Sequence, residues 1–183
     1  QNLEDLGDAV LKNDATLVFV NTPHNPTGQV LMEDEVRAFM NRIGESPIVI
    51  LDEAYLEYAE NLQGVSVGTK LLKDYKNLIV CRTFSKAYGL AGLRIGYGIG
   101  RPELMDLLNR VRQPFNLTRF SAPAALAALK DQDWLNKTIL ENNTELDRLR
   151  TFFEKHRLDV SPSSANFLLV NLPTSAQPLC EQL

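Results

Sequence analysis

The sequence has few of the residues that build metal centres, disulfide frameworks and nucleic-acid surfaces. Its 183 residues include two cysteines, Cys81 and Cys180, which lie far apart and have no metal-ligand spacing. There are 19 lysines and arginines against 23 acidic residues, and the net charge of −4 argues against a nucleic-acid or anionic-membrane surface. No apolar run approaches the roughly 20 residues that span a bilayer, and the first residues lack a signal-peptide pattern. A cytoplasmic enzyme fits this composition.

The rare reactive residues have ordinary structural explanations. Cys81 falls in an apolar run, which favours an inert core thiol over a nucleophile. His24 stands beside a proline and is interpreted as a packing or hydrogen-bonding residue, and His156 is expected to interact with carbonyls at the end of a helix. The glycines at 96, 98 and 100 do not match a dinucleotide-binding loop, because Arg101 occupies the place of the last glycine.

Three short apolar runs are each followed by a polar segment. The runs cover 17–20, 48–51 and 78–81, and each predicts a buried strand. The polar segments after them cover 21–28, 52–55 and 82–94. The ends of parallel strands gather on one edge of a sheet, where α/β proteins bind ligands. We therefore expect the three polar segments to meet at one site.

The segment after the third run contains a lysine where a structural role is hard to find. The ammonium of Lys86 is costly to bury unless it is paired or used chemically, and a less basic lysine can attack a carbonyl to form a Schiff base. Thr83, Ser85 and Arg94 offer two hydroxyls and a planar cation, which suit a phosphate group. For a lone Ser-Lys pair, a solvated loop would be the better interpretation, and the other two polar segments change that balance.

The remaining sequence alternates helices with these strands. Helical spacing of apolar residues predicts helices within 1–14, over 32–43, near 67–75, from Pro102 to Val111, over 121–130 as a buried helix, and over 132–157. Further strands are predicted over 95–100 and 166–170. A strand–helix–strand order favours right-handed parallel crossovers.

Read together, the polar segments carry a specific set of motifs. N-P-T-G at 25–28, D-E-A-Y at 52–55, and T-x-S-K at 83–86 with Arg94 eight residues later resemble the fold-type I aminotransferases that depend on pyridoxal phosphate. The amino-acid sequence over 52–58 and 85–94 is most similar to that of histidinol-phosphate aminotransferases. The resemblance implies amino transfer between histidinol phosphate and 2-oxoglutarate, in histidine biosynthesis.

The resemblance also implies a role for each matching residue. Lys86 would hold pyridoxal phosphate covalently and then carry a proton between the substrate and the cofactor. Asp52 would keep the pyridine nitrogen protonated, and only one of Asp52 and Glu53 can face the site because neighbours on a strand point to opposite sides. Asn25 and Tyr55 would bond the phenolic oxygen. The phosphate would be bound by Thr83, Ser85 and Arg94. Asn25-Pro26 is a candidate cis peptide bond.

The same resemblance predicts the architecture. We expect an α/β fold: part of a three-layer α/β/α, mostly parallel sheet of a large domain over 1–130, a linking helix over 131–158, and the start of a small α+β domain over 159–183. Members of the family are roughly twice as long, so the chain is expected to be a fragment that is inactive or nearly so alone. The first half of the large domain and a late arginine that binds the substrate acid group would lie outside it. The intact protein is expected to be a homodimer.

Alternatives remain open from the sequence. Another enzyme of the same fold type could act on an aromatic amine or an aspartate-like substrate, or decarboxylate a phosphothreonine-like one. A protein of a different class could use the pocket only to bind a phosphate compound, or could serve only for dimerisation.

Overall fold

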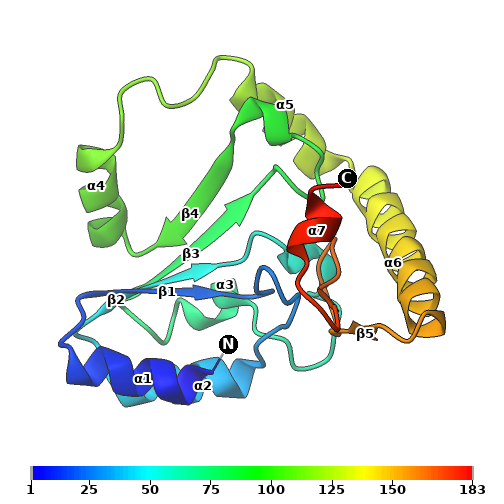
Figure 1. Ribbon diagram of the computed structural model, residues 1–183. Helices are drawn as coiled ribbons and strands as arrows, with labels where there is room; N and C mark the ends of the chain where they lie inside the picture. Colours follow the sequence, from blue (N-terminus) through cyan, green and yellow to red (C-terminus); the bar gives the residue numbers. More distant parts are fainter. Residues whose placement is uncertain (1, 183) are drawn as a thin grey trace.

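The computed structural model describes residues 2–182 and contains a four-stranded sheet at its centre (Figure 1). Its strands are β1 (Leu17–Asn21), β2 (Ile48–Asp52), β3 (Leu78–Thr83) and β4 (Gly96–Gly100), and they lie side by side in that order. β1, β2 and β3 are parallel, whereas β4 runs antiparallel to β3. The mostly parallel α/β sheet predicted from the sequence is confirmed.

Helix α1 (Leu3–Lys12) precedes β1, α2 (Glu33–Ile43) connects β1 to β2, and α3 (Gly68–Leu71) lies between β2 and β3. Asn2 caps α1, since its side chain accepts hydrogen bonds from the backbone N–H groups of Glu4 and Asp5. α2 ends at Gly44, which has a positive φ of 72°. The helix expected near 67–75 is confirmed only as the short α3. A 3₁₀ turn, η1 (Leu56–Tyr58), follows β2, and a second, η2 (Ala91–Leu93), precedes β4.

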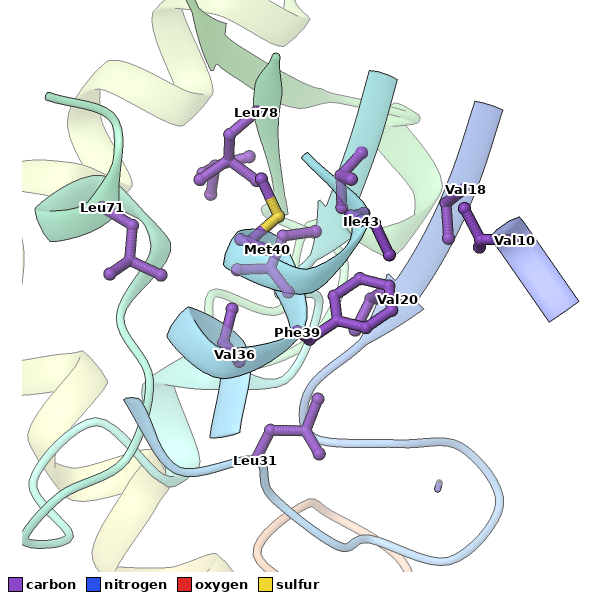
Figure 2. Packing of buried hydrophobic residues seen from close by; sticks show 13 residues of the cluster. Val10, Val18, Val20, Leu31, Val36, Phe39, Met40, Ile43, Leu71 and Leu78 are labelled. Carbon is purple, nitrogen blue, oxygen red and sulfur yellow. The ribbon is translucent and has the colours of Figure 1, made fainter. Parts of the chain in front are cut away.

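The main core lies between one face of the sheet and helices α1 to α3 (Figure 2). Alternate residues of the parallel strands point into it, because successive side chains on a strand face opposite sides. Its buried side chains are Val10, Val18, Val20, Leu31, Val36, Phe39, Met40, Ile43, Val49, Leu51, Leu71, Leu78 and Val80. This cluster holds the three parallel strands in fixed register, so that their carboxyl ends share one edge. On the opposite face of β1, Leu17 and Phe19 are exposed.

The later helices differ in burial from what the sequence indicated. α4 (Pro102–Val111) and α5 (Ser121–Lys130) form where predicted, and α6 (Gln132–Lys155) is the long helix. The apolar stripe of α4 is exposed, and α5 buries only Ser121 and Ala125, so the expectation that α5 is a buried helix is wrong. Within residues 2–182, none of the helices is both long and apolar enough to cross a membrane.

The C-terminal part folds back towards the sheet after α6. It contains β5 (Asp159–Val160), antiparallel to β6 (Val170–Asn171), and a short helix α7 (Gln177–Cys180). The strand predicted over 166–170 is therefore wrong in extent, because its partner β5 offers two residues for pairing and only Val170 of the apolar run takes part. The turn before β6 touches the sheet domain: the Ser164 N–H donates to the Gly28 carbonyl at 2.8 Å.

Candidate active site

The carboxyl ends of the three parallel strands bring the polar segments together. Asn21 at the end of β1 lies beside Asp52 at the end of β2, and Asp52 lies beside Cys81 near the end of β3. Because β4 is antiparallel to β3, the chain that leaves the sheet at Thr83 returns to the same edge at Gly96. Residues between these two points, including Lys86 and Arg94, therefore stay at the edge where the other polar segments end.

A pocket of about 310 Å³ lies at this edge. Five of the seven predicted site residues line it; they are Asp52, Thr83, Ser85, Lys86 and Arg94. Three further lining residues were not among the predicted site residues; they are Ala54, Cys81 and Arg82. Cys81 is the register partner of Asp52 in the neighbouring strand. An alignment of the ends of the two predicted strands could therefore have placed Cys81 near the site.

The other two predicted residues, Tyr55 and Asn25, lie next to Lys86 in a chain of contacts. Its Nζ lies 5.1 Å from the centroid of the Tyr55 ring, which is within cation–π range. Tyr55 in turn accepts a hydrogen bond at its hydroxyl from Asn25 Nδ2 at 3.2 Å. Among residues 2–182, no carboxylate lies within ion-pair distance of Lys86 Nζ. The structure thus brings all seven predicted residues to one edge of the sheet.

The loop that positions Asn25 has two cis peptide bonds. The Asn25-Pro26 bond is cis, as the sequence suggested, and Thr22-Pro23 is cis as well, which was not anticipated. Inside this loop His24 Nδ1 bonds the Thr27 hydroxyl at 2.9 Å, and burial lowers the pKa of His24. This confirms the hydrogen-bonding interpretation of His24. His156 likewise bonds the Phe152 carbonyl of α6 at 2.7 Å, as expected.

Asp52 and Glu53 point to opposite sides of the sheet edge, as the alternation of a strand requires. Asp52 lines the pocket, and its Oδ1 accepts the Ala54 N–H at 3.0 Å. Glu53 is fully buried and pairs with Arg82, with 2.9 Å between Oε2 and Nε. One carboxylate is therefore available to a ligand, and its neighbour stabilises the strands from behind.

The hydroxyls and the guanidinium form the other side of the pocket. Thr83 Oγ1 accepts the Ser85 N–H at 3.1 Å, which fixes the chain as it leaves β3. Arg94 Nη1 lies 3.5 Å from Ser85 Oγ and donates to the Ala91 carbonyl at 3.0 Å. Arg94 itself has a φ of 49°, a left-handed conformation that turns the chain into β4. Two hydroxyls and one planar cation converge here, which is the donor set that binds a phosphate group.

Cys81 is half-buried and lines the pocket, so its expected place in the core is wrong. Burial raises the pKa of its thiol, and the nearby charges of Asp52 and Glu53 raise it further. A raised pKa keeps the sulfur protonated at neutral pH, so the expectation of an inert thiol fits its surroundings even though its position differs.

A larger cavity of about 650 Å³ lies on the other side of the 23–28 loop, between that loop and the C-terminal part. Its lining includes Gly28, Glu35, Arg150 and Ser163. Lys86 and Asp52 do not line it, and both line the smaller pocket instead.

These features define an α/β protein with a lysine, a carboxylate and a phosphate-type donor set at the carboxyl edge of a parallel sheet. The chain belongs to the family of class I and II aminotransferases, whose model matches residues 1–183. The motif resemblance seen in the sequence is thereby confirmed.

Individual relatives agree with this assignment. Over 173 residues the chain is 43% identical to histidinol-phosphate aminotransferase 2 of Haemophilus influenzae, covering 94% of this chain and 47% of the relative. It is also 43% identical to histidinol-phosphate aminotransferase 1 of Nitrosococcus oceani, covering 100% of this chain and 49% of the relative. A crystal structure of histidinol-phosphate aminotransferase from Sinorhizobium meliloti in complex with pyridoxal-5'-phosphate superposes with a TM-score of 0.89 at 36% identity, covering 96% of this chain and 47% of that one. The chain spans about half the length of the curated relatives it matches.

Proposed function

We propose that this chain forms the cofactor-binding part of a histidinol-phosphate aminotransferase that uses pyridoxal phosphate. One observation carries the proposal: Lys86 lines a pocket together with Asp52, Thr83, Ser85 and Arg94. The names of the relatives at 41–44% identity support the substrate, and the cofactor in the Sinorhizobium meliloti structure supports the choice of ligand. The whole protein would transfer an amino group between histidinol phosphate and 2-oxoglutarate.

The residues that line the pocket fit pyridoxal phosphate. Its phosphate would be held by Thr83, Ser85 and Arg94, and its ring nitrogen would face Asp52. When bound, pyridoxal phosphate supplies an electron sink for the carbon that loses a proton. Asn25 and Tyr55, already joined by a hydrogen bond, would bind the phenolic oxygen.

Lys86 would carry the chemistry of the chain itself. As an uncharged amine, its Nζ is a nucleophile towards a carbonyl, and once free it can accept a proton and return it. The Tyr55 ring beneath Nζ would restrict where the amine points. The Asp52 carboxylate would face the ring nitrogen and attract its positive charge.

The organisation of the whole protein is part of the proposal. Residues 1–130 would belong to the large domain, 131–158 would link the domains, and 159–183 would begin the small domain. The intact protein would be a cytoplasmic homodimer with amine and 2-oxo acid substrates and without nucleic-acid or membrane partners. Light scattering of the intact protein tests the dimer, and comparing kcat/KM for histidinol phosphate with aromatic amines and aspartate tests the substrate.

The cofactor assignment is tested by trapping the lysine. Pyridoxal phosphate is added to the purified chain, the mixture is reduced with borohydride, and the modified lysine is located by mass spectrometry. We expect an adduct at Lys86 that is absent in Lys86→Ala and retained in Lys70→Ala, a matched control because Lys70 is exposed on α3. Scattered labelling that is equal in all three proteins would contradict a formed site in this chain. Repeating the test on a longer polypeptide then separates an incomplete site from a wrong assignment.

A further inference from the structure

Tyr55 is buried but lies outside the apolar core. It is 8% exposed and belongs to none of the three buried apolar clusters that residues 2–182 form. Its hydroxyl accepts the hydrogen bond from Asn25, and Lys86 Nζ lies over its ring at 5.1 Å from the centroid. Because the core clusters do not hold this ring, its orientation depends on the few side chains that contact it.

The hydrogen bond from Asn25 does not fix the plane of the Tyr55 ring. The hydroxyl oxygen of a tyrosine lies on the axis about which the ring turns, so rotation about χ2 leaves the oxygen in place. This torsion is broad and roughly two-fold unless neighbours restrict it. The plane matters to Lys86, because the face of an aromatic ring attracts a cation whereas its edge is electropositive. A ring that turned would present its edge to the lysine amine.

Phe167 makes a contact that does depend on the plane of the ring. Its centroid lies 5.2 Å from that of Tyr55, and the two rings are nearly perpendicular, with an angle of 87° between their planes. This is an arrangement that aromatic pairs prefer, and it changes when either ring turns. Phe167 lies in the segment before β6, in the C-terminal part of the chain.

The segment that contains Phe167 is itself anchored on two sides. From α6, Asn142 Nδ2 donates a hydrogen bond to the Ala165 carbonyl at 3.1 Å, and Ala165 is fully buried. On the side of the sheet, the Ser164 N–H donates to the Gly28 carbonyl, in the same loop as the asparagine that bonds the tyrosine. The backbone that carries the phenylalanine ring is therefore held against both neighbouring parts of the structure.

We propose that Phe167 is a positioning residue that sets the plane of the Tyr55 ring and so keeps the face of that ring towards Lys86. The C-terminal part thereby contributes to the lysine site, although the residues that line the 310 Å³ pocket all lie between Asp52 and Arg94. The position of the lysine amine over the ring can be measured without a cofactor, so only the effect on cofactor binding rests on the proposed function.

Nuclear magnetic resonance measures where the lysine amine lies. The lysines of the chain are dimethylated with isotope-labelled formaldehyde and a borohydride reductant, and the Lys86 signal is assigned by its loss in Lys86→Ala. Methyl protons over an aromatic face resonate upfield, so Tyr55→Ala marks the complete loss of this shift. We expect Phe167→Tyr, which keeps the ring, to retain the wild-type shift. Phe167→Ala and Phe167→Leu, which lack the ring, should move towards the value of Tyr55→Ala.

The control makes the same substitution elsewhere. Phe115 is 100% exposed, so Phe115→Ala should leave the Lys86 signal unchanged. Protection of the Ser164 amide from hydrogen exchange reports whether the segment stays in place; where Phe167→Ala loses it, the contrast between Phe167→Tyr and Phe167→Leu decides. A wild-type shift in Phe167→Leu would overturn the proposal, because apolar volume alone would then be enough.

A double-mutant cycle tests the effect on cofactor binding, which rests on the proposed function. The concentration of pyridoxal phosphate that gives half-maximal trapping on Lys86 is measured in wild type, Phe167→Leu, Tyr55→Ala and the double variant. We expect an increase of about twofold to tenfold in Phe167→Leu, the range of one aromatic pair, and no further increase when Tyr55 is already absent. A side chain that only stabilises the fold would give equal increases in both backgrounds, and that result would overturn the proposal.

The two measurements separate the two proposals. If Lys86 of the wild-type chain is not labelled while the methyl shifts follow the expected pattern, the proposed function fails and the role of Phe167 stands. If Lys86 is labelled equally well in wild type and Phe167→Leu, and the methyl shifts of these two proteins agree, the role of Phe167 fails and the proposed function stands.

Discussion

Gly28 joins the sheet domain to the C-terminal part at a contact that leaves no room for a side chain. A Cβ built on Gly28 would clash with Ser163 Oγ and lie 2.5 Å from Ser163 Cβ and 2.7 Å from Ser163 Cα. Gly28 also has a φ of 72°. The change Gly28→Ala therefore introduces two separate penalties, one from backbone conformation and one from overlap.

Gly44 separates these penalties. It has the same φ of 72°, and a Cβ there would meet nothing within 4 Å. Gly44→Ala should cost about 1–2 kcal/mol, the ordinary penalty for an L-residue in the left-handed region. Gly28→Ala should cost about 1–3 kcal/mol more, because the overlap with a backbone atom forces the turn at 161–164 to move.

Urea unfolding followed by circular dichroism measures both losses, and hydrogen exchange at the Ser164 amide reports the contact itself. We expect Gly28→Ala to lose more stability than Gly44→Ala and to lose protection at Ser164, whose N–H bonds the Gly28 carbonyl. Adding Ser163→Gly should restore part of the difference, since it removes the side-chain overlap but leaves the backbone penalty. Equal losses in Gly28→Ala and Gly44→Ala would refute the argument that the overlap matters.

Three further predictions concern the site. Glu53→Ala should cost about 3–5 kcal/mol in urea unfolding, because it leaves a buried guanidinium unpaired, whereas Asp52→Ala should leave stability nearly unchanged. Tyr55→Phe should cost at most about 1.5 kcal/mol, since it loses one hydrogen bond but keeps the ring beneath the lysine, and should shift the absorbance of added pyridoxal phosphate. With iodoacetamide at pH 8, Cys81 should react more slowly than the exposed Cys180, because burial raises the pKa of the Cys81 thiol; the two rates are compared by mass spectrometry.

Each of these has a result that would count against it. Equal losses at positions 52 and 53 would mean that the two carboxylates do not face different surroundings. An unchanged absorbance in Tyr55→Phe would remove the hydroxyl from the cofactor site. Faster labelling of Cys81 than of Cys180 would indicate a thiolate in the pocket.

The sequence was most informative where local pattern and motif agreed. The apolar runs before Asn21, Asp52 and Arg82 become strands β1 to β3, and the motif residues after them meet at one edge because parallel strands end on the same side. Asp52 and Glu53 separate as predicted, since alternation on a strand is a local property. The direction of a strand, in contrast, depends on its partner strand, and the glycine-rich sequence at 96–100 does not indicate that β4 is antiparallel to β3. The connection from Thr83 to Gly96 covers residues 84–95 and contains only the turn η2, whereas a parallel crossover usually contains an α-helix, so the absence of a helix there is consistent with the antiparallel direction.

Burial was harder to predict, because it depends on partners far along the chain. The stripe on α4 has the spacing of a buried helix, yet Val111 is 79% exposed, and Leu126 on α5 is 55% exposed. Phe167 was placed in a strand but instead packs edge-on against the Tyr55 ring, with centroids 5.2 Å apart. Glu57 is buried as well, although a glutamate between a leucine and a tyrosine has the pattern of an ordinary surface position.

The alternation at the end of β2 has a consequence for insertions and deletions. Side chains on a strand repeat every two residues, so adding or removing one residue before Asp52 would exchange the faces of the two carboxylates. Glu53 would then face the pocket with a longer side chain, and Asp52 would be left behind the sheet, too short to reach both the Gly68 N–H and Arg82 as Glu53 does. Loops elsewhere in the chain can change length without this effect. The five residues from Ile48 to Asp52 cannot, because their number sets which carboxylate faces the ligand.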